Sequence, residues 1–453
     1  MRSEVLKFKP WKVRASSDIR LGEQSPVFLL VTALLGPSYA RFILRLDRIS
    51  IEGREILVEE YRRAVADEGR FIIAYRHPGD ADPHLVFHAL TNLLRGEAPA
   101  TAADGRPGAW YPSGSEVQLW ATPLVNWALR NAGIVPIQHG SVARATLDYL
   151  VKAVAERRRP MAIAPEGMAT FHQDLVSEFD AGTARIAALA ADKLGASGRT
   201  VPVRIVPIAI EYDFERTTSP ERLSRFVRRL ERRILPGDEG LPRLGSADRE
   251  PNALRSRLLA VWEGLVAIAE LHFARAWGIK PAAAGTGLRE RALTLIDSSI
   301  GRLEAYYSVE PSASLKARIL VIRAESLHRV FYSKDEIARL SPVERAAAER
   351  GAAESYFLDQ VYLLAGLLVH LDPAYIDGDP LFDRLVETAV NLDDFANRLG
   401  GRGIGQRSRY FMKDARIIVG EPIEAGHREG EKLRESSDRV TEELDSAFRR
   451  LVR

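Results

Sequence analysis

Between residues 71 and 211 the sequence alternates short apolar runs with longer stretches of helical spacing, and this alternation restricts the fold more than any other feature. Apolar runs bounded by turn residues are typical of buried strands, and amphipathic stretches between them predict crossover helices. The predicted strands are Phe71–Arg76, Gly133–Ile137, Pro160–Ala164 and Val203–Glu211, and the predicted helices are Pro83–Leu94, Val142–Glu156 and Thr183–Leu194. This pattern favours an α/β domain with a largely parallel sheet flanked by helices.

Further elements are predicted on both sides of this region. They are helix Pro26–Leu46, strand Arg48–Glu52, helix Glu55–Asp67, strand Asp414–Gly420 and a charged helix from about residue 429. From residue 219 to 399 nearly every stretch has helical periodicity, with predicted helices Leu254–Trp277, Leu288–Ser308, Ala313–Tyr332, Pro342–His370 and Pro380–Leu399. We therefore predict a helical N-terminal segment over residues 1–47, an α/β domain over 48–218, a large all-helical insertion over 219–409, and a closing strand and helix over 410–453.

Composition excludes several classes of protein. The 453 residues contain no cysteine, which rules out disulfides, thiolate metal sites, iron–sulfur clusters and a cysteine nucleophile. Lys and Arg (64) barely outnumber Asp and Glu (61), so the chain does not have the charge of a dedicated nucleic-acid binder. No run reaches the roughly 18–20 apolar residues of a membrane-spanning helix, and the charged N-terminus does not resemble a secretory signal. We expect a cytoplasmic protein.

The residues after the first of these strands have the clearest chemical meaning. His77 directly follows the strand Phe71–Arg76, at the carboxyl end where open parallel sheets bind ligands. Pro78-Gly79 predicts a turn, and Asp82 before Pro83 favours Asp82 as the N-cap of the next helix. Such a turn can bring the imidazole beside the carboxylate, which makes a general base. The alternative is a surface histidine and a carboxylate that only caps the helix.

The pattern His77-x4-Asp82 after an apolar strand resembles the first signature of the glycerolipid acyltransferases, the superfamily of lysophosphatidate and glycerol-3-phosphate acyltransferases. Five further segments resemble the later motifs of that family, in the same order. They are Pro123–Ile137, Ala164–Gly167, Ala181–Ala188, Val206–Ile210 and Ile418–Ile423. The resemblance covers about residues 45–215 and 410–453 and leaves the helical insertion outside.

The resemblance implies acyl transfer from a thioester to a hydroxyl. His77 would take the proton from the acceptor hydroxyl, Asp82 would orient the imidazole, and the acceptor oxygen would attack the thioester of acyl-CoA or acyl-carrier protein directly. Glu166 and Gly167 would shape the acceptor site. The resemblance implies neither a metal nor a cofactor beyond this acyl-thioester co-substrate.

Three positions depart from the family pattern. Arg76 stands where Asn or Ser is usual, His139 replaces an arginine that binds the acceptor's phosphate, and Met168-Ala-Thr170 replaces Thr-Arg-Ser. The candidate replacements for phosphate binding are Arg76, Arg144 and Arg185, because a guanidinium can bind phosphate through two parallel hydrogen bonds.

The expected reaction is conversion of lysophosphatidate to phosphatidate, a step of phospholipid biosynthesis. Glycerol 3-phosphate is the first alternative acceptor, since Asp80–Pro83 resembles the Glu-Ala-Asp-Pro of soluble plastid-type glycerol-3-phosphate acyltransferases. A non-catalytic lipid-binding or scaffold protein on the same fold is the second alternative, because two phosphate-binding groups are replaced. A metallohydrolase is the third, since His84 and His88 have the spacing of metal ligands on one helix face.

Two segments are candidates for membrane contact. The apolar residues of Pro26–Leu46 lie near Arg41, Arg45 and Arg48, and this segment is the stronger candidate. Glu221–Ile234 is a basic amphipathic helix that can lie on anionic lipid or simply on the protein surface. We expect peripheral association with the cytoplasmic face of a membrane.

Overall fold

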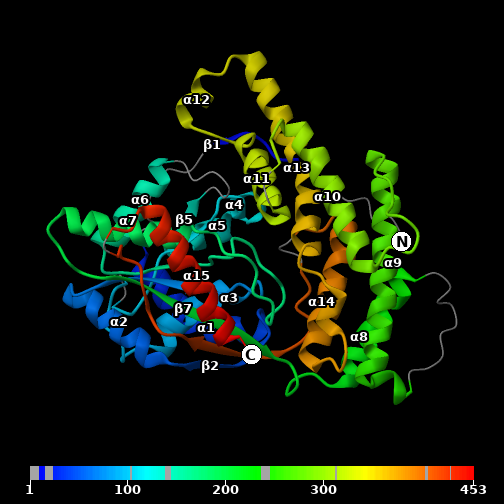
Figure 1. Ribbon diagram of the computed structural model, residues 1–453, viewed down its shortest axis with the longest axis horizontal. Coiled ribbons are helices and arrows are strands. Elements are labelled where there is room, and N and C mark those ends of the chain that lie inside the picture. Colours follow the sequence, from blue (N-terminus) through cyan, green and yellow to red (C-terminus); the bar gives the residue numbers. More distant parts are fainter. Residues whose placement is uncertain are drawn as a thin grey trace. The chain divides into compact units, whose positions relative to one another are not determined.

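The computed structural model describes residues 10–15, 24–102, 105–137, 144–235, 245–311, 314–403, 407–428 and 430–452 (Figure 1). The chain divides into two compact units. One contains the described residues from 24 to 213 together with 413–452, and we call it the α/β unit. The other contains residues 10–15 and the described residues from 214 to 412, and we call it the helical unit.

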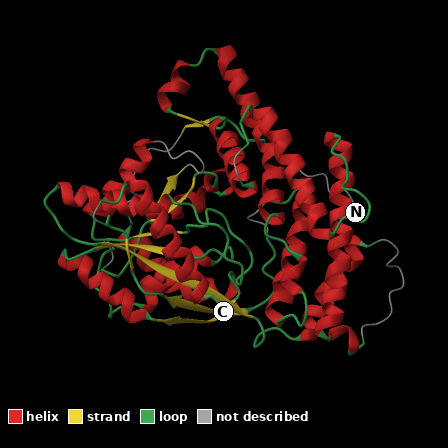
Figure 2. Cartoon of the chain, viewed as in Figure 1, coloured by secondary structure: helices red, strands yellow, loops and turns green. Residues whose placement is uncertain are grey.

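A six-stranded sheet forms the centre of the α/β unit, with strand order β2-β9-β7-β3-β6 and β10 paired to β7 (Figure 2). Its strands are β2 (Leu46–Glu52), β3 (Arg70–Tyr75), β6 (Met161–Ile163), β7 (Val203–Asp213), β9 (Lys413–Val419) and β10 (Ile423–Glu424). The pairs β2–β9, β3–β7 and β3–β6 are parallel, whereas β9 and β10 both run antiparallel to β7. The predicted α/β fold with a largely parallel sheet is confirmed.

Strand β3 lies inside the sheet, between β7 and β6. All six of its residues are buried, as expected for a parallel strand with both faces covered. Its carboxyl end, where His77 follows, is therefore held by a strand that is buried along its whole length.

The segment predicted as the strand Gly133–Ile137 does not join the main sheet. It forms β5 (Ile134–Ile137), which pairs in parallel with β4 (Tyr111–Gly114) in a separate two-stranded sheet. A single bridge between Trp110 and Met161 connects this pair to β6. The sequence pattern indicated a strand but contained nothing on its partner.

The α/β unit also contains helices, several of which pack on the six-stranded sheet. They are α1 (Pro26–Phe42), α2 (Arg54–Ala66), α3 (Asp82–His88), α4 (Val117–Trp120), α5 (Pro123–Asn131), α6 (Arg144–Glu156), α7 (Gly182–Ala196) and α15 (Leu433–Leu451). The predicted helix Pro83–Leu94 is shorter as an α-helix, because α3 continues as a π-helical turn over Ala89–Leu93. Helix α15 buries Val440, Leu444 and Phe448, four residues apart on one face, in the core that contains Ile72 of β3.

The helical unit contains α8 (Pro220–Ile234), α9 (Pro251–Trp277), α10 (Leu288–Tyr307), α11 (Leu315–His328), α12 (Lys334–Arg339), α13 (Pro342–Leu368) and α14 (Phe382–Leu399). A short parallel pair, β1 (Arg14–Ala15) and β8 (Phe331–Tyr332), belongs to the same unit. In α8, the apolar stripe that includes Leu223, Phe226 and Leu230 is buried, and the helix packs on α9 and α14. The interpretation of α8 as a membrane-binding helix is therefore wrong, because its apolar face is already covered.

The chain leaves and re-enters the α/β unit at facing positions. Strands β7 and β9 are antiparallel, and Asp213, the last residue of β7, pairs with Asp414 near the start of β9. Residues 214–412 thus occupy the place of a hairpin loop between two neighbouring strands.

Candidate active site

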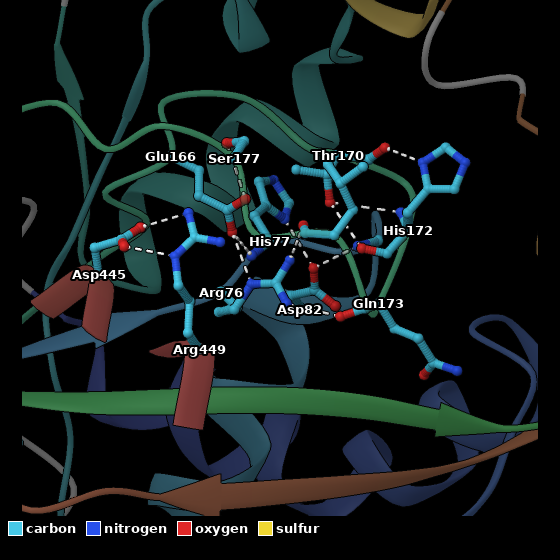
Figure 3. Close-up of polar contacts among 12 residues, drawn as sticks. Arg76, His77, Asp82, Glu166, Thr170, His172, Gln173, Ser177, Asp445 and Arg449 are labelled. Atoms are coloured by element: carbon cyan, nitrogen blue, oxygen red, sulfur yellow. Dashed lines mark hydrogen bonds and ion pairs between the residues drawn. The ribbon is translucent and has the colours of Figure 1, made fainter. Parts of the chain in front are cut away.

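His77 and Asp82 are in contact at the carboxyl end of β3 (Figure 3). His77 Nδ1 lies 2.9 Å from Asp82 Oδ2. The carboxylate is completely buried, while the imidazole keeps 22% of its surface exposed. Because the carboxylate accepts the Nδ1 proton, the neutral ring presents Nε2 as its basic nitrogen. The structure brings together the two residues that the sequence predicted as a pair.

Asp82 is not the N-cap of α3, so that prediction is wrong. It is the first residue of the helix, and the N-cap is Ala81, which makes no side-chain capping bond. The Asp82 carboxylate instead points back over the turn. Its Oδ2 also accepts the Gly79 backbone N–H at 2.6 Å, and its Oδ1 accepts the hydroxyl of Tyr212. These three donors, the imidazole included, fix the carboxylate beside His77, so it does not cap the helix.

Electrostatics at this pair favour the charged imidazole. Burial by itself lowers the pKa of His77, but the hydrogen bond and the charge of Asp82, with smaller contributions from Glu166 and Asp80, raise that pKa above its ordinary value. A base in this setting is stabilised after it has accepted a proton, which is the state that general-base catalysis generates.

Arg76 does not serve as a phosphate ligand, contrary to the prediction. Its side chain is fully buried, and its Nε lies 3.3 Å from Glu166 Oε1. Its Nη1 donates to the Gln173 carbonyl at 2.7 Å, and its Nη2 donates to the Leu175 carbonyl. The guanidinium is occupied by internal acceptors, which belong to a loop about a hundred positions later in the chain.

Glu166 is a buried carboxylate that connects His77 to neighbouring parts of the site. Its Oε1 accepts the backbone N–H of His77 at 2.9 Å, and its Oε2 accepts the hydroxyl of Ser177 at 3.1 Å. The side chain has no exposed surface, so it does not line an acceptor pocket. The predicted role in shaping the acceptor site is corrected to one of positioning His77.

Gly167 completes the turn that presents Glu166. Its N–H donates to the Ala164 carbonyl at 3.3 Å, and its φ of 70° lies in the left-handed region that glycine adopts at little cost. The turn follows β6 directly, so it places the Glu166 carboxylate at the same sheet edge as His77.

The other predicted phosphate ligands lie on helix surfaces. Arg144 is the exposed first residue of α6, and Arg185 is exposed in the first turn of α7. Neither is among the described hydrogen-bond partners of His77 or Asp82. His139 lies outside the described residues. Phosphate binding by Arg144 or Arg185 therefore stays a prediction.

Sequence reasoning missed the loop that frames the pair. Thr170 donates its backbone N–H to the His77 carbonyl at 3.0 Å, and the Gln173 side chain accepts the backbone N–H of Tyr212. Both residues follow the Pro-Glu-Gly turn within a few positions, and Tyr212 lies near the carboxyl end of β7. Proximity to the carboxyl ends of neighbouring strands is the signal that could have identified them.

The histidines with metal-ligand spacing have other neighbours. The His84 ring packs against Tyr39 of α1 at 5.6 Å, and His88 Nδ1 lies 2.9 Å from Asn92 Nδ2. Burial lowers the pKa of His88. Within the described ranges, no three His, Asp or Glu side chains gather as a metal site. The metallohydrolase alternative thus has no support from the part of the chain that the structure describes.

Residues 48–211 match the family model described as Acyltransferase. This segment is an acyltransferase domain. The match confirms the resemblance to glycerolipid acyltransferases over these residues, and the acyltransferase domain includes His77, Asp82 and Glu166. No curated protein and no solved structure matches the chain. The match ends at residue 211, and the helical unit begins at residue 214.

Proposed function

We propose that this protein transfers a fatty acyl group from acyl-CoA or acyl-carrier protein to the hydroxyl of a glycerolipid, with lysophosphatidate as the acceptor. The observation that carries the proposal is the His77–Asp82 pair, at 2.9 Å, inside the acyltransferase domain at the carboxyl end of a central strand. In the proposed reaction, His77 Nε2 removes the proton of the acceptor hydroxyl as its oxygen attacks the thioester carbonyl. The tetrahedral intermediate then expels the thiolate, which takes the proton back from the imidazolium. This sequence uses no cofactor besides the acyl thioester.

Thiol release from palmitoyl-CoA tests the proposal, with lysophosphatidate, glycerol 3-phosphate or no acceptor. We expect release that depends on lysophosphatidate, and a loss of about 10²–10⁴-fold in the His77→Ala variant, the usual effect of removing a positioned base. The control is His427→Ala, which removes another histidine–carboxylate contact of the α/β unit, that with Asp192.

The alternatives give different results in the same assay. Release with glycerol 3-phosphate alone would identify that acceptor. Bound lysophosphatidate without thiol release, either from palmitoyl-CoA or from palmitoyl-acyl-carrier protein in a repeat of the assay, would favour a non-catalytic lipid binder. A folded His77→Ala protein with wild-type turnover would refute the assignment of the base.

A membrane as source of the acceptor is supported by an apolar surface on α1 and α5. We call this set of residues the apolar surface: Val27, Leu30, Val31, Leu34, Leu35, Phe42, Ile43, Leu124, Val125 and Trp127. The two helices meet where the rings of Phe28 and Trp127 lie 5.3 Å apart. Exposed patches of this kind mark interaction sites, and an exposed tryptophan is typical of membrane interfaces.

Helix α1, which carries most of the apolar surface, packs against the helix that begins at the candidate active site. Helix α1 contacts α3 through Tyr39 and His84, and α3 begins at Asp82. No described helix is both long and apolar enough to cross a bilayer. We propose peripheral binding to the cytoplasmic face of a membrane through this surface, which would deliver a lipid acceptor close to His77.

Co-sedimentation with vesicles of phosphatidylcholine and phosphatidylglycerol tests membrane binding. The double variant Leu34→Asp, Leu35→Asp should reduce the bound fraction at least tenfold, because it replaces two exposed leucines with charges. Val343→Asp is the matched control, since Val343 is 80% exposed but lies on α13. Equal binding of the double variant and the wild type would contradict the proposal.

A further inference from the structure

Tyr212 holds the side of Asp82 that faces away from the histidine. Its hydroxyl donates to Asp82 Oδ1, whereas Oδ2 receives His77 Nδ1 and the Gly79 N–H. Tyr212 lies near the carboxyl end of β7, and only 2% of its surface is exposed. The hydroxyl thus belongs to a buried chain of hydrogen bonds that runs from Tyr212 through Asp82 to the imidazole.

Three neighbours keep the Tyr212 ring in place. The backbone N–H of Tyr212 donates to the Gln173 side chain. The ring lies against Gly79 so closely that a Cβ at Gly79 would stand 3.3 Å from it. Lys413 Nζ, at the start of β9, lies 3.3 Å from the ring centroid. The positive charge of the ammonium draws electron density from the phenol ring. The Tyr212 hydroxyl is therefore a stronger hydrogen-bond donor.

We propose that Tyr212 is a positioning residue of the acyl-transfer reaction, which orients Asp82 and limits the basicity that Asp82 gives to His77. The inference rests on the proposed function of His77. A hydrogen bond donated to one carboxylate oxygen disperses the negative charge that the imidazole senses at the other. Without the hydroxyl, the carboxylate is less well oriented and attracts the imidazole proton more strongly. His77 then stays protonated over more of the pH range and is a poorer base at neutral pH.

The Tyr212→Phe variant removes the hydroxyl and keeps the ring, its contact with Gly79 and its contact with Lys413. We expect kcat at neutral pH to fall about tenfold, the typical effect of losing one hydrogen bond to a charged group, with KM changed less than twofold. The inflection of the kcat–pH profile should move to higher pH. NMR titration of the His77 ring, assigned with His77→Gln, should show the same upward movement of its pKa.

The control for burial is Tyr61→Phe, since Tyr61 is also fully buried and donates to the Gly108 carbonyl at 3.1 Å. It loses a comparable internal hydrogen bond but has no contact with Asp82, so its pH profile should match the wild type. Lys413→Met is the second variant and should move the His77 titration upward by less than Tyr212→Phe, because the hydroxyl remains but donates more weakly.

The outcomes separate this inference from the proposed function. If His77→Ala abolishes turnover while the pH profile and the His77 titration stay unchanged in both Tyr212→Phe and Lys413→Met, the positioning role is refuted and the proposed function stands. If the wild type has no turnover, the NMR titration still tests the link between Tyr212 and His77. A fall in the His77 pKa in Tyr212→Phe would also overturn the proposal.

Discussion

At the residue scale, the candidate site depends on one contact that the sequence could predict and several that it could not. His77 and Asp82 are five positions apart across one turn, so local geometry permits their contact, at 2.9 Å, and the resemblance to the acyltransferase motif favoured it over a surface histidine. Arg76 is adjacent in sequence, yet its acceptors are the carbonyls of Gln173 and Leu175. No local pattern indicates that a guanidinium will be enclosed by a distant loop, which is why its assignment to phosphate was wrong.

The pH dependence of turnover follows from the direction of the His77 shift. Asp82 raises the pKa of His77, and a general base must start unprotonated, so kcat/KM should rise with pH and level off only above that raised pKa. In Asp82→Asn the negative charge is gone. The pKa of His77 should then fall, the rising limb should move to lower pH, and the plateau should drop by about 10²–10⁴-fold. Rate profiles of both proteins with lysophosphatidate measure this, and inflections at the same pH would contradict it.

At the scale of elements, periodicity predicted nearly every helix but not how the helices are used. Helix α1 starts at Pro26 as predicted, because Ser25 caps it by accepting the Phe28 N–H at 3.3 Å. It ends at Phe42, four residues earlier than predicted. Helix α5 was not predicted, and its exposed face with Leu124 and Trp127 completes the apolar surface. Whether an apolar residue is exposed depends on which elements pack against it, and the apolar pattern of the sequence does not contain that information.

The contact between α15 and the sheet offers a test at this scale. Gly420 follows β9, and a Cβ there would stand 2.8 Å from Leu451 at the end of α15 and 3.0 Å from Pro207 of β7. Gly420→Ala should therefore lower the free energy of unfolding by about 1–3 kcal/mol, as overpacking of a closed contact does. Gly426→Ala is the matched control, because nothing lies within 4 Å of its Cβ position. Urea denaturation of both variants measures the difference, and equal stability would show that the Leu451 side chain or α15 itself gives way.

At the scale of the whole molecule, the helical unit is an insertion between paired strands. The sequence pattern changes from alternating strands and helices to helices only, and this change predicted such a unit. The pairing of Asp213 with Asp414 shows where the chain leaves the α/β unit and where it returns. The sequence alone does not contain this pairing, because the antiparallel register of β7 and β9 joins residues about two hundred positions apart.

The facing ends of β7 and β9 predict that the α/β unit folds without the helical unit. Replacing residues 214–412 with Gly-Asn-Gly leaves a four-residue loop, Lys413 included, between Asp213 and Asp414, a length that hairpins accept. We expect a soluble monomer with a single cooperative thermal transition and the same His77 titration by NMR. A product that is unfolded by circular dichroism would show that the α/β unit needs the helical unit for its stability.

Strand β2 has only β9 as its neighbour in the described sheet, and β9 begins about 360 positions after β2 ends. A ribosome therefore releases β2 long before its partner exists. Throughout the translation of the helical unit, the edges of β2 and β7 that await β9 remain open to pairing with other chains. We therefore expect the newly made chain to be more prone to aggregation before β9 is synthesised than after the sheet is complete.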